Sequence, residues 1–433
     1  MTKRIYLILS SVFLLASAAF GQANMDSVMR ADTAFQRYLR EQSTVGNQDN
    51  ASDNQDSAMQ ADTAFQRYLS QQNASFAQYA AHEDSLYQQY YEEQEKAFQE
   101  YVQQITKVWG QNNIDTTTKK DWVSYDPDFT GKRSVDFENG NAKVEVVMDK
   151  AAVGNPDQVR TKLKAEVLKL IKDRGTDDPM ETKQNTHAND TPILTGQLQT
   201  ADGKTVTESN ADQFVNQLIE SSKIDKEDIT GTDGNKRTAI ILKIPLVSDH
   251  IRRRAETFRD VIIANAGKYK MDPTLLFAVT HTESYFNPKA RSGVPAYGLM
   301  QLVPTSGARA AYQFIYSVDT LVTPEYLYTP GNNVELGAGY LDLLLTKDFK
   351  RVKDDRSRVY LAISAYNTGP GNVARAFTGK KNLNQAIPII NGMTSDEVYD
   401  RLRTNLPFQE TRDYVQRVST RMGMYNSMVN GDN

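Results

Sequence analysis

The sequence predicts a mostly α-helical protein with three parts: a long N-terminal helical segment, a small α+β domain and a nearly all-α C-terminal domain. Aromatic residues recur at helical spacing in the first part, and apolar and polar residues alternate in the second. In the third part, apolar residues at helical spacing follow repeated helix-start signals. The 433 residues exceed the usual size of one domain, so we expect more than one hydrophobic core.

The first residues are typical of a secretory signal peptide. Lys3-Arg4 precede an apolar stretch from Ile5 to Phe20, and small residues close this stretch around Gly21. The stretch is shorter than the ~20 apolar residues that a membrane span needs. We therefore assign residues 1–21 to a signal peptide and expect an exported protein of the periplasm or cell envelope. An uncleaved membrane anchor is the alternative.

Residues 22–110 contain a duplication and a periodic aromatic stripe. The segment Ala31–Leu39 recurs unchanged as Ala61–Leu69. From the second copy onward, a Phe/Tyr-x-x-Tyr pair returns every eleven residues: Phe65 and Tyr68, Phe76 and Tyr79, Tyr87 and Tyr90, then Phe98 and Tyr101.

The spacing of this stripe predicts a long helix. Eleven residues fill three turns, so the aromatic side chains stay on one face. We expect the helix to run from about Asp56 to Trp109 and to end before Gly110. Two interpretations stay open: the stripe packs on its own domain, or it forms a stalk that self-associates or binds a partner.

Residues 111–248 are expected to form an accessory α+β domain. Ser134–Phe137 and Ala142–Val147 alternate apolar and polar residues around a turn signal, which predicts a β-hairpin. A charged helix is expected from about Pro156 to Lys172, and another strand at Thr238–Ile244. The polar stretch Asp173–Thr191 has few apolar residues and is expected to be a surface loop or disordered.

Residues 249–433 are expected to be helical almost throughout. Helix-start signals recur along this part of the chain. They are Asp272-Pro273, Pro304-Thr305-Ser306, Asn332-Asn333, and Thr394-Ser395 with Glu397.

The composition excludes several classes of function. Acidic and basic residues nearly balance, with a net charge of -4, so we expect no nucleic-acid partner. The absence of cysteine excludes disulfides, thiol catalysis, cysteine metal sites and the lipid anchor of bacterial lipoproteins. The four histidines lie far apart in the sequence, so we expect neither a zinc site nor a cofactor.

Glu283 is the candidate catalytic residue. It lies at the C-terminal end of the helix predicted to open at Asp272-Pro273, just before Tyr285–Pro288. The negative end of the helix dipole and an apolar neighbourhood both disfavour ionisation, so both would raise the pKa of this carboxyl toward the range of a general acid. A single glutamate at a helix end is more often a solvated surface residue. The surrounding motifs therefore decide between a catalytic glutamate and a surface residue.

Four motifs follow one another with characteristic order and spacing. They are His281-Thr282-Glu283-Ser284, Gly298-Leu299-Met300-Gln301, Ala365-Tyr366-Asn367-Thr368-Gly369, and Glu410-Thr411-Arg412-Asp413-Tyr414-Val415. Together they resemble the signatures of the lytic transglycosylases with the goose-type lysozyme fold. The resemblance implies that residues 249–433 form a lysozyme-like catalytic domain, the SLT domain.

Further segments resemble the membrane-bound lytic murein transglycosylase C group over roughly residues 98–433. They are Asp249-His250 with Arg254-Ala255, Ala296–Pro304, Tyr326–Asn333, and, in the accessory domain, Tyr125, Arg133, Phe137 and Gly140. The sequence departs from the group in two respects. It lacks the lipidated cysteine, and it carries the duplicated tyrosine-rich segment.

The resemblance implies a reaction and a substrate, the glycan strands of peptidoglycan. Such enzymes cleave the β-1,4 bond between N-acetylmuramic acid and N-acetylglucosamine and leave a 1,6-anhydromuramyl end instead of adding water. Glu283 would act first as the acid and then as the base. The acetamido group of the substrate would replace the second carboxyl that ordinary glycosidases use.

The resemblance also assigns substrate-side roles. Ser284 would hydrogen-bond near Glu283, Gln301 and Asn367 would bind sugar amides, Tyr414 would steady Glu283, and Met300, Tyr366 and Tyr297 would line the sugar groove. Each residue type also serves as a cap, turn or core residue, and the motif order favours function most strongly for Glu283, Gln301 and Asn367. His281 precedes Glu283 by two residues and faces another side of the helix, so it has no role in this mechanism.

Two other functions stay open at this point. A muramidase would hydrolyse the same bond with water. A non-catalytic cell-wall binding or scaffolding protein would use the aromatic segment and only hold glycan. Association with the membrane or envelope, and self-association through residues 22–110, are likewise open.

Overall fold

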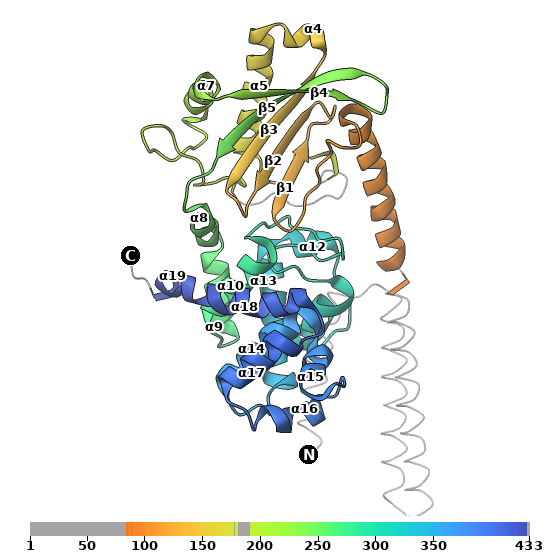
Figure 1. Cartoon of the computed structure of the whole chain (residues 1–433), viewed down its shortest axis with the longest axis vertical. Helices are drawn as coiled ribbons and strands as arrows, with labels where there is room; N and C mark the ends of the chain where they lie inside the picture. Colours follow the sequence, from red (N-terminus) through yellow and green to blue (C-terminus); the bar gives the residue numbers. More distant parts are fainter. Residues whose placement is uncertain (1–83, 86, 177, 181–190, 431–433) are drawn as a thin grey trace, which may run out of the picture. The chain divides into compact units, whose positions relative to one another are not determined.

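The computed structural model describes residues 84, 85, 87–176, 178–180 and 191–430. Residues from Tyr90 onward form one compact unit. In the described chain this unit combines one five-stranded antiparallel sheet with many helices (Figure 1). We call residues 90–248 the sheet region and residues 249–430 the helical region. The predicted signal peptide, the duplication and most of the aromatic stripe lie outside the described residues.

The sheet has the strand order β1-β2-β3-β5-β4. Its strands are β1 (Asp121–Tyr125), β2 (Gly131–Asp136), β3 (Asn141–Met148), β4 (Ile224–Thr230) and β5 (Lys236–Pro245). The predicted hairpin is confirmed as β2 and β3, with Asp136 opposite Asn141. The strand predicted at Thr238–Ile244 is confirmed as β5. Strand β4 was not predicted, because four of its seven residues are charged and this run at the sheet edge breaks the apolar alternation.

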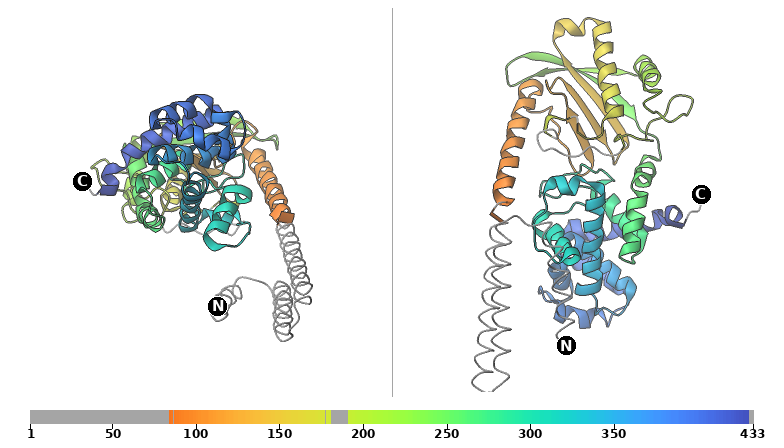
Figure 2. Two further views of the ribbon diagram at one scale, coloured as in Figure 1. Left: turned by 90° about the horizontal axis from the view of Figure 1, so that it is seen from below. Right: turned by 180° about the vertical axis from the view of Figure 1, so that it is seen from behind.

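Helices cover both faces of the sheet (Figure 2). One face packs on α5 (Pro156–Lys172) and α7 (Ala211–Ser221) through side chains such as Val144 and Leu242. The opposite face packs on the helix that ends at Trp109. The short helix α4 (Lys150–Val153) precedes α5.

The helix before the sheet ends at Trp109 and is followed by Gly110 at φ 76°, as the sequence predicts. Tyr101, Ile105 and Trp109 are buried against the sheet, and Phe98 packs beside them. For this last unit of the aromatic stripe, the interpretation as a stripe that packs on its own domain is confirmed. The stalk interpretation of the earlier units stays a prediction.

Helix α5 has the predicted bounds. Pro156 occupies its first position, and the side chain of Asn155 caps it by accepting hydrogen bonds from the backbone N–H groups of Asp157 and Gln158.

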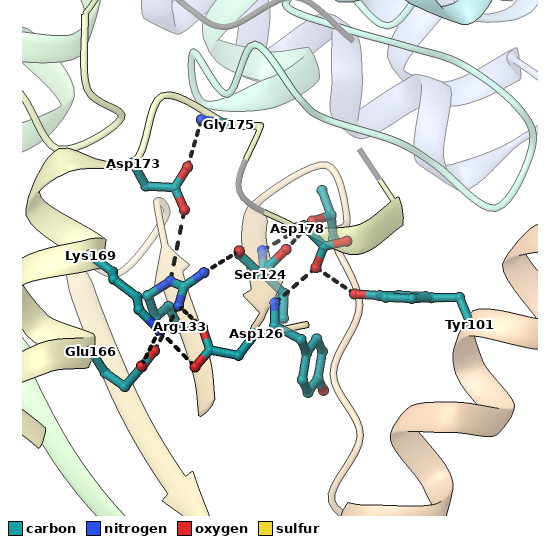
Figure 3. Close-up of polar contacts among 12 residues, drawn as sticks. Tyr101, Ser124, Asp126, Arg133, Glu166, Lys169, Asp173, Gly175 and Asp178 are labelled. Carbon is teal, nitrogen blue, oxygen red and sulfur yellow. Dashed lines mark hydrogen bonds and ion pairs between the residues drawn. The ribbon is translucent and has the colours of Figure 1, made fainter. Parts of the chain in front are cut away.

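The prediction of a surface loop after α5 is wrong for the first residues of that stretch. Asp173, Asp178 and Met180 are buried. Figure 3 shows why: Asp178 accepts hydrogen bonds from the Tyr101 hydroxyl at 2.6 Å and from the Tyr125 backbone N–H at 2.8 Å. Burial of Asp178 is tolerated because these donors satisfy its carboxylate, and the Asp173 carboxylate accepts a hydrogen bond from the Gly175 backbone N–H at 2.7 Å. Residues 181–190 lie outside the described residues.

The helical region contains no named β-strand in its described residues, which agrees with the predicted all-α domain. Its elements are α8 (His250–Thr257), α9 (Arg259–Lys268), α10 (Pro273–Ser284), η1 (Pro304–Ala308), α11 (Arg309–Tyr316), α12 (Pro324–Tyr328), α13 (Pro330–Leu343), η2 (Leu344–Asp348), α14 (Asp355–Thr368), α15 (Pro370–Thr378), α16 (Leu383–Ile390), α17 (Ser395–Asn405), α18 (Gln409–Met424) and α19 (Asn426–Asn430). Within the described ranges, none of these helices is long and apolar enough to span a membrane.

Helix α10 lies at the centre of the helical core, and ten of its twelve residues are buried. The apolar run Leu275–Val279 is expected to be buried in this way, and the polar residues Thr280, His281, Glu283 and Ser284 are buried with it. Its predicted start is confirmed, because Asp272 accepts a hydrogen bond from the Thr274 backbone N–H and Pro273 holds the first position.

Two further start signals had different outcomes. The capping box of Thr394 and Glu397 is confirmed at α17. The start predicted at Asn332-Asn333 is wrong, because α13 begins earlier at Pro330, whose ring favours the first position of a helix. The side chain of Asn333 has another role in the candidate site.

Candidate active site

Glu283 is a buried carboxyl in the last turn of α10. Only 6% of the residue is exposed. The helix stops directly after it, because Tyr285 adopts a left-handed conformation with φ 51° and Phe286 follows with φ 59°. Burial raises the pKa of Glu283 above its ordinary value. The site therefore favours a protonated carboxyl, as the apolar pattern of the helix predicts.

Charged and hydroxyl groups from two other segments, the loop before β1 and α18, act on Glu283. The ammonium of Lys119 lies 3.7 Å from Oε2, and this cation lowers the pKa of Glu283. Tyr414 of α18 also lowers this pKa through its hydroxyl, whereas the negative charge of Glu410 raises it. Burial outweighs the two stabilising contacts, so the net shift is upward.

Two tyrosines near the carboxyl remain neutral: Tyr414, which is buried, and Tyr366, which is half-buried. Burial raises the pKa of Tyr414 and of Tyr366 well above the ordinary value, and the charge of Glu283 adds to both shifts. The Tyr414 hydroxyl is buried without a hydrogen-bond partner among the described residues, and the pKa values of Tyr414 and Glu283 depend on each other. A protonated hydroxyl here is a ready donor to a carboxylate.

The second motif forms a tight turn that only glycine allows. Gly298 has φ 75°, and a Cβ atom there would clash with the Leu327 carbonyl and the Asn333 side chain. Asn333 of α13 donates to the carbonyl oxygens of Tyr297 and Leu327 at 2.8 Å and accepts from the Met300 backbone N–H at 2.7 Å. Asn333 therefore holds the turn, a role that sequence reasoning missed because it treated this residue as a helix start.

Gln301 follows the turn in a left-handed conformation with φ 48°. Its Nε2 donates to the carbonyl oxygens of Ala290 and Gly298, each at 3.0 Å. These two bonds fix the amide orientation. The Oε1 atom is buried and has no hydrogen-bond partner among the described residues. This acceptor is the unsatisfied polar group of the turn.

Ser284 and Tyr366 tie this turn to two helices. The hydroxyl of Ser284, which is fully buried, donates to the Leu299 carbonyl at 2.6 Å. The hydroxyl of Tyr366 in α14 donates to the Met300 carbonyl at 2.8 Å. The Met300 side chain is fully buried and packs against Gly337 of α13. Ser284 and Met300 thus lie behind the surface, and Tyr366 is half-buried.

The third and fourth motifs also meet. The Oδ1 atom of Asn367 accepts a hydrogen bond from the Thr411 hydroxyl at 2.7 Å, which joins α14 to α18.

Tyr297 is buried, and its ring packs edge-on against Tyr328 with centroids 5.6 Å apart. Burial raises the pKa of Tyr297 to about 12.

His281 lies apart from this group. Its Nδ1 atom is 2.9 Å from the Tyr425 hydroxyl, and its ring packs on Phe286. Burial lowers the pKa of His281 to about 3, so the imidazole is neutral at physiological pH. The structure agrees with the sequence-based decision to leave it out of the mechanism.

Arg254 links the end of α10 to the sheet region. This buried guanidinium of α8 donates to the carbonyl oxygens of Tyr285 at 2.9 Å and Phe137 at 2.8 Å, and to the Gln197 side chain at 2.7 Å. Burial lowers the pKa of Arg254 to about 9. The turn of the β2–β3 hairpin touches α8 as well, because a Cβ atom at Gly140 would lie 2.6 Å from His250 Nε2.

Lys119 is the functional candidate that sequence reasoning missed. It belongs to the loop before β1, far from Glu283 along the chain, in a Thr-Lys-Lys-Asp segment that has the composition of a solvated surface. No local pattern identifies its partner.

Other features of the described residues do not add to this site. No group of three or more His, Asp or Glu side chains is arranged to hold a metal there. A cavity of about 600 Å³ lies in the sheet region and is lined by Thr130, Met148, Asp157 and Arg237 among others. None of its lining residues belongs to the group around Glu283.

Comparison with known proteins defines the class of this enzyme. Residues 260–388 match the family "Transglycosylase SLT domain", and residues 80–257 match "Membrane-bound lytic murein transglycosylase C, N-terminal domain". Together these two regions define a lytic transglycosylase, a lyase that cleaves peptidoglycan.

Curated relatives identify the family. A membrane-bound lytic murein transglycosylase C of Klebsiella pneumoniae is 30% identical over 322 residues, 74% of this chain and 86% of the relative. The protein of that name from Sodalis glossinidius is 31% identical over 73% of this chain and 85% of the relative. The chain belongs to the membrane-bound lytic murein transglycosylase C family.

Solved structures give weaker matches. An inactive mutant of the lytic transglycosylase Slt from Pseudomonas aeruginosa is 30% identical with a TM-score of 0.32, covering 40% of this chain and 25% of that one. The 70 kDa soluble lytic transglycosylase from Escherichia coli is 24% identical with a TM-score of 0.33, covering 42% of this chain and 26% of that one.

Proposed function

We propose that Glu283 is the single catalytic carboxyl and that the product carries a 1,6-anhydromuramyl end. The observation that carries the proposal is a buried glutamate at a helix end whose pKa is raised by burial. A raised pKa favours the protonated form that a general acid needs when substrate arrives.

In the first step, Glu283 donates its proton to the glycosidic oxygen between N-acetylmuramic acid and N-acetylglucosamine. The bond from C1 to that oxygen breaks. The acetamido oxygen of the same muramyl sugar bonds to C1 and takes the place of a second carboxyl. Glu283 is then a carboxylate.

In the second step, this carboxylate removes the proton from the 6-hydroxyl of the muramyl sugar. The oxygen of that hydroxyl attacks C1, and the bond from C1 to the acetamido oxygen breaks. Glu283 regains its proton, and no water is consumed. The neighbouring Glu410 is an exposed residue, which supports a mechanism with one carboxyl.

The surrounding residues support these steps. The Tyr414 hydroxyl, kept neutral because burial raises its pKa, donates to Glu283 when it becomes a carboxylate. The unpartnered Oε1 of Gln301 accepts an N–H from a sugar acetamido group. Tyr366 and Asn367, which are half-buried, contact the glycan. Ser284, Met300 and Tyr297, which are buried, fix the turn behind these groups.

We also propose that the protein is exported and acts in the cell envelope, in the periplasm. Residues 1–21 have the composition of a signal peptide, and the curated relatives carry the name membrane-bound. The sequence contains no cysteine, and for this reason we propose that the protein acts without the lipid anchor of the group.

Digestion of purified peptidoglycan by wild type and Glu283→Gln tests the catalytic proposal. Wild type is expected to release muropeptides lighter by one water than their hydrolysed counterparts, and Glu283→Gln is expected to release none. Reducing ends alone would indicate a hydrolytic muramidase. Undiminished digestion by Glu283→Gln would remove Glu283 from the mechanism. If wild type binds sacculi but does not digest them, the alternative of a non-catalytic scaffolding protein would be favoured.

A further inference from the structure

A lysine of the sheet region lies beside the candidate catalytic carboxyl. The Nζ atom of Lys119 is 3.7 Å from Glu283 Oε2, and the two side chains are 37% and 7% exposed. Exposed ion pairs are screened by water and salt and contribute little. Here one partner is buried, so the interaction is screened less.

The loop that carries Lys119 is fixed internally. The Thr118 hydroxyl donates to the Asp121 carboxylate at 2.8 Å and accepts from the backbone N–H groups of Lys120 and Asp121, each at 3.1 Å. These bonds close a small turn around Lys119.

The same loop is also tied to the segment that follows α10. The side-chain amide of Asn287 donates to the carbonyl oxygens of Thr118 at 3.5 Å and Asp121 at 3.4 Å. The backbone N–H of Arg291 donates to the Thr118 carbonyl at 3.4 Å. The backbone on either side of Lys119 is therefore held against the chain that leaves the catalytic helix.

Two adjacent lysines of this loop have different partners. Lys120 pairs with Glu138, whose other oxygen accepts a hydrogen bond from the Tyr285 hydroxyl at 2.6 Å. Lys119 instead directs its charge at Glu283. Lys120 therefore offers a control with the same side chain in the same loop.

The remaining groups that face Glu283 do not balance its negative charge. Tyr414 and Glu410 come from α18, and Tyr366 comes from α14. The tyrosines are neutral and Glu410 is an acid, so among these facing groups Lys119 supplies the positive charge.

We propose that the sheet region completes the active site, with Lys119 as a positioning residue that holds the Glu283 carboxylate formed when the glycosidic oxygen takes its proton. The proposal rests on the function proposed above. Negative charge appears at a buried position in the first step, and the ammonium balances it. When Glu283 regains its proton from the 6-hydroxyl, that charge disappears again.

The test compares Lys119→Met, Lys119→Arg and Lys120→Met with wild type. The measurement is the pH dependence of kcat/KM for release of anhydromuropeptides from soluble, uncrosslinked glycan strands. For Lys119→Met we expect kcat/KM at the optimum to fall about tenfold. An opposite charge within this distance changes the acid dissociation constant of a carboxyl by about a factor of ten.

The position of the basic limb of the profile is the specific readout. Without the ammonium the pKa of Glu283 rises further, so Glu283 stays protonated to higher pH and the basic limb moves to higher pH. Lys119→Arg is expected to restore both rate and profile. Lys120→Met is expected to leave the basic limb in place, because the Lys120 ammonium pairs with Glu138 and not with Glu283.

The proposal is overturned if Lys119→Met changes neither kcat/KM nor the position of the basic limb. It is also overturned if KM rises while the basic limb stays in place, because Lys119 would then be a substrate contact. Thermal unfolding establishes that the variants are folded, and Lys119→Gln replaces Lys119→Met if the latter is not. Glu283→Gln separates the two proposals: if it is inactive while the Lys119→Met profile is unmoved, only this inference fails. If Glu283→Gln is fully active, the proposed mechanism itself fails.

Discussion

Buried carboxylates occur in both regions of the molecule, and their surroundings differ. In the sheet region, the guanidinium of Arg133 donates to Asp126 and Glu166 at 2.7 Å and to Ser124 at 2.8 Å, and Lys169 closes the group (Figure 3). In the helical region, Glu283 has one ammonium at 3.7 Å. Burial therefore accompanies two outcomes: a closed ionic cluster that supports the fold, and a loosely compensated carboxyl that can exchange a proton.

The pKa values of these carboxyls also differ. Burial raises the pKa of Asp126, but hydrogen bonding within the cluster, with Lys169 and Arg133 as donors, outweighs this effect and lowers it overall, whereas burial and the neighbouring Asp126 raise the pKa of Glu166. For Glu283 the contacts with Lys119 and Tyr414 do not outweigh burial, and the pKa is raised. A raised pKa is therefore common to Glu166 and Glu283, and the candidate catalyst differs in having one ammonium at 3.7 Å where Glu166 has Arg133 and Lys169, each at 2.7 Å.

The largest expected effect is the loss of activity in Glu283→Gln. Removing a general acid is expected to lower the rate by about 10²–10⁴-fold. The fold should be retained, because glutamine has nearly the same shape. The matched control is Glu166→Gln in the Arg133 cluster. Folded molecules of this variant should cleave peptidoglycan at the wild-type rate. Equal losses of rate per folded molecule in both variants would remove the distinction between the two sites.

The turn at Gly298 gives the next effect. Gly298→Ala combines an unfavourable φ with a clash against Leu327 and Asn333, so the turn must move. A displacement of about 1 Å can cost on the order of 100-fold in rate. The control is Gly203→Ala, which has φ 80° but meets no atom within 4 Å. Peptidoglycan turnover by both variants separates displacement from backbone strain, and equal turnover would argue against a role for the turn.

Replacing Arg133 should affect stability instead of chemistry. Arg133→Met removes the buried guanidinium from Asp126 and Glu166 and leaves them only the more exposed Lys169, and breaking a buried ion pair costs about 3–5 kcal/mol of unfolding free energy. Arg160→Met is the control, because Arg160 forms an exposed pair with Glu220 that is expected to contribute about 0–1 kcal/mol. Denaturant unfolding measures both. A cost for Arg133→Met no larger than that of the control would show that the cluster does not support the fold.

The smallest effect is a pH dependence of stability at Glu283. A raised pKa in the folded state means that the folded protein binds this proton more tightly than the unfolded chain does. Its stabilisation is complete below the ordinary value of 4.5 and is lost as pH rises through the raised pKa. The Tm of wild type should therefore fall relative to that of Glu283→Gln as pH rises above about 4.5. A constant Tm difference across this range would contradict the raised pKa.

Much of the fold follows from local sequence patterns. The bounds of α5 and α10 are set by Asn155 and Asp272 as caps with proline in the next position, and such signals act within a few residues. Strand β5 follows from an apolar run. Strand β4 does not, because an edge strand with charged side chains is stabilised by pairing with β5 more than by its own pattern.

The candidate site was predictable in part. Glu283, Gln301 and Asn367 lie in recognisable motifs, and their positions follow from motif order. The roles of Asn333 and Lys119 depend on contacts between segments that are distant in sequence. Asn333 resembles a helix cap and Lys119 a surface charge until tertiary structure brings them to the turn and to Glu283. Asp173 and Asp178 are buried for the same reason.

The mass of the muropeptides released by wild type is the most direct test of the central claim that Glu283 works alone. Glycan strands should yield products that end in 1,6-anhydromuramic acid, lighter by one water than hydrolysed ends, and these products should be absent with Glu283→Gln. Products that carry reducing ends, or the same anhydro products from Glu283→Gln, would contradict it.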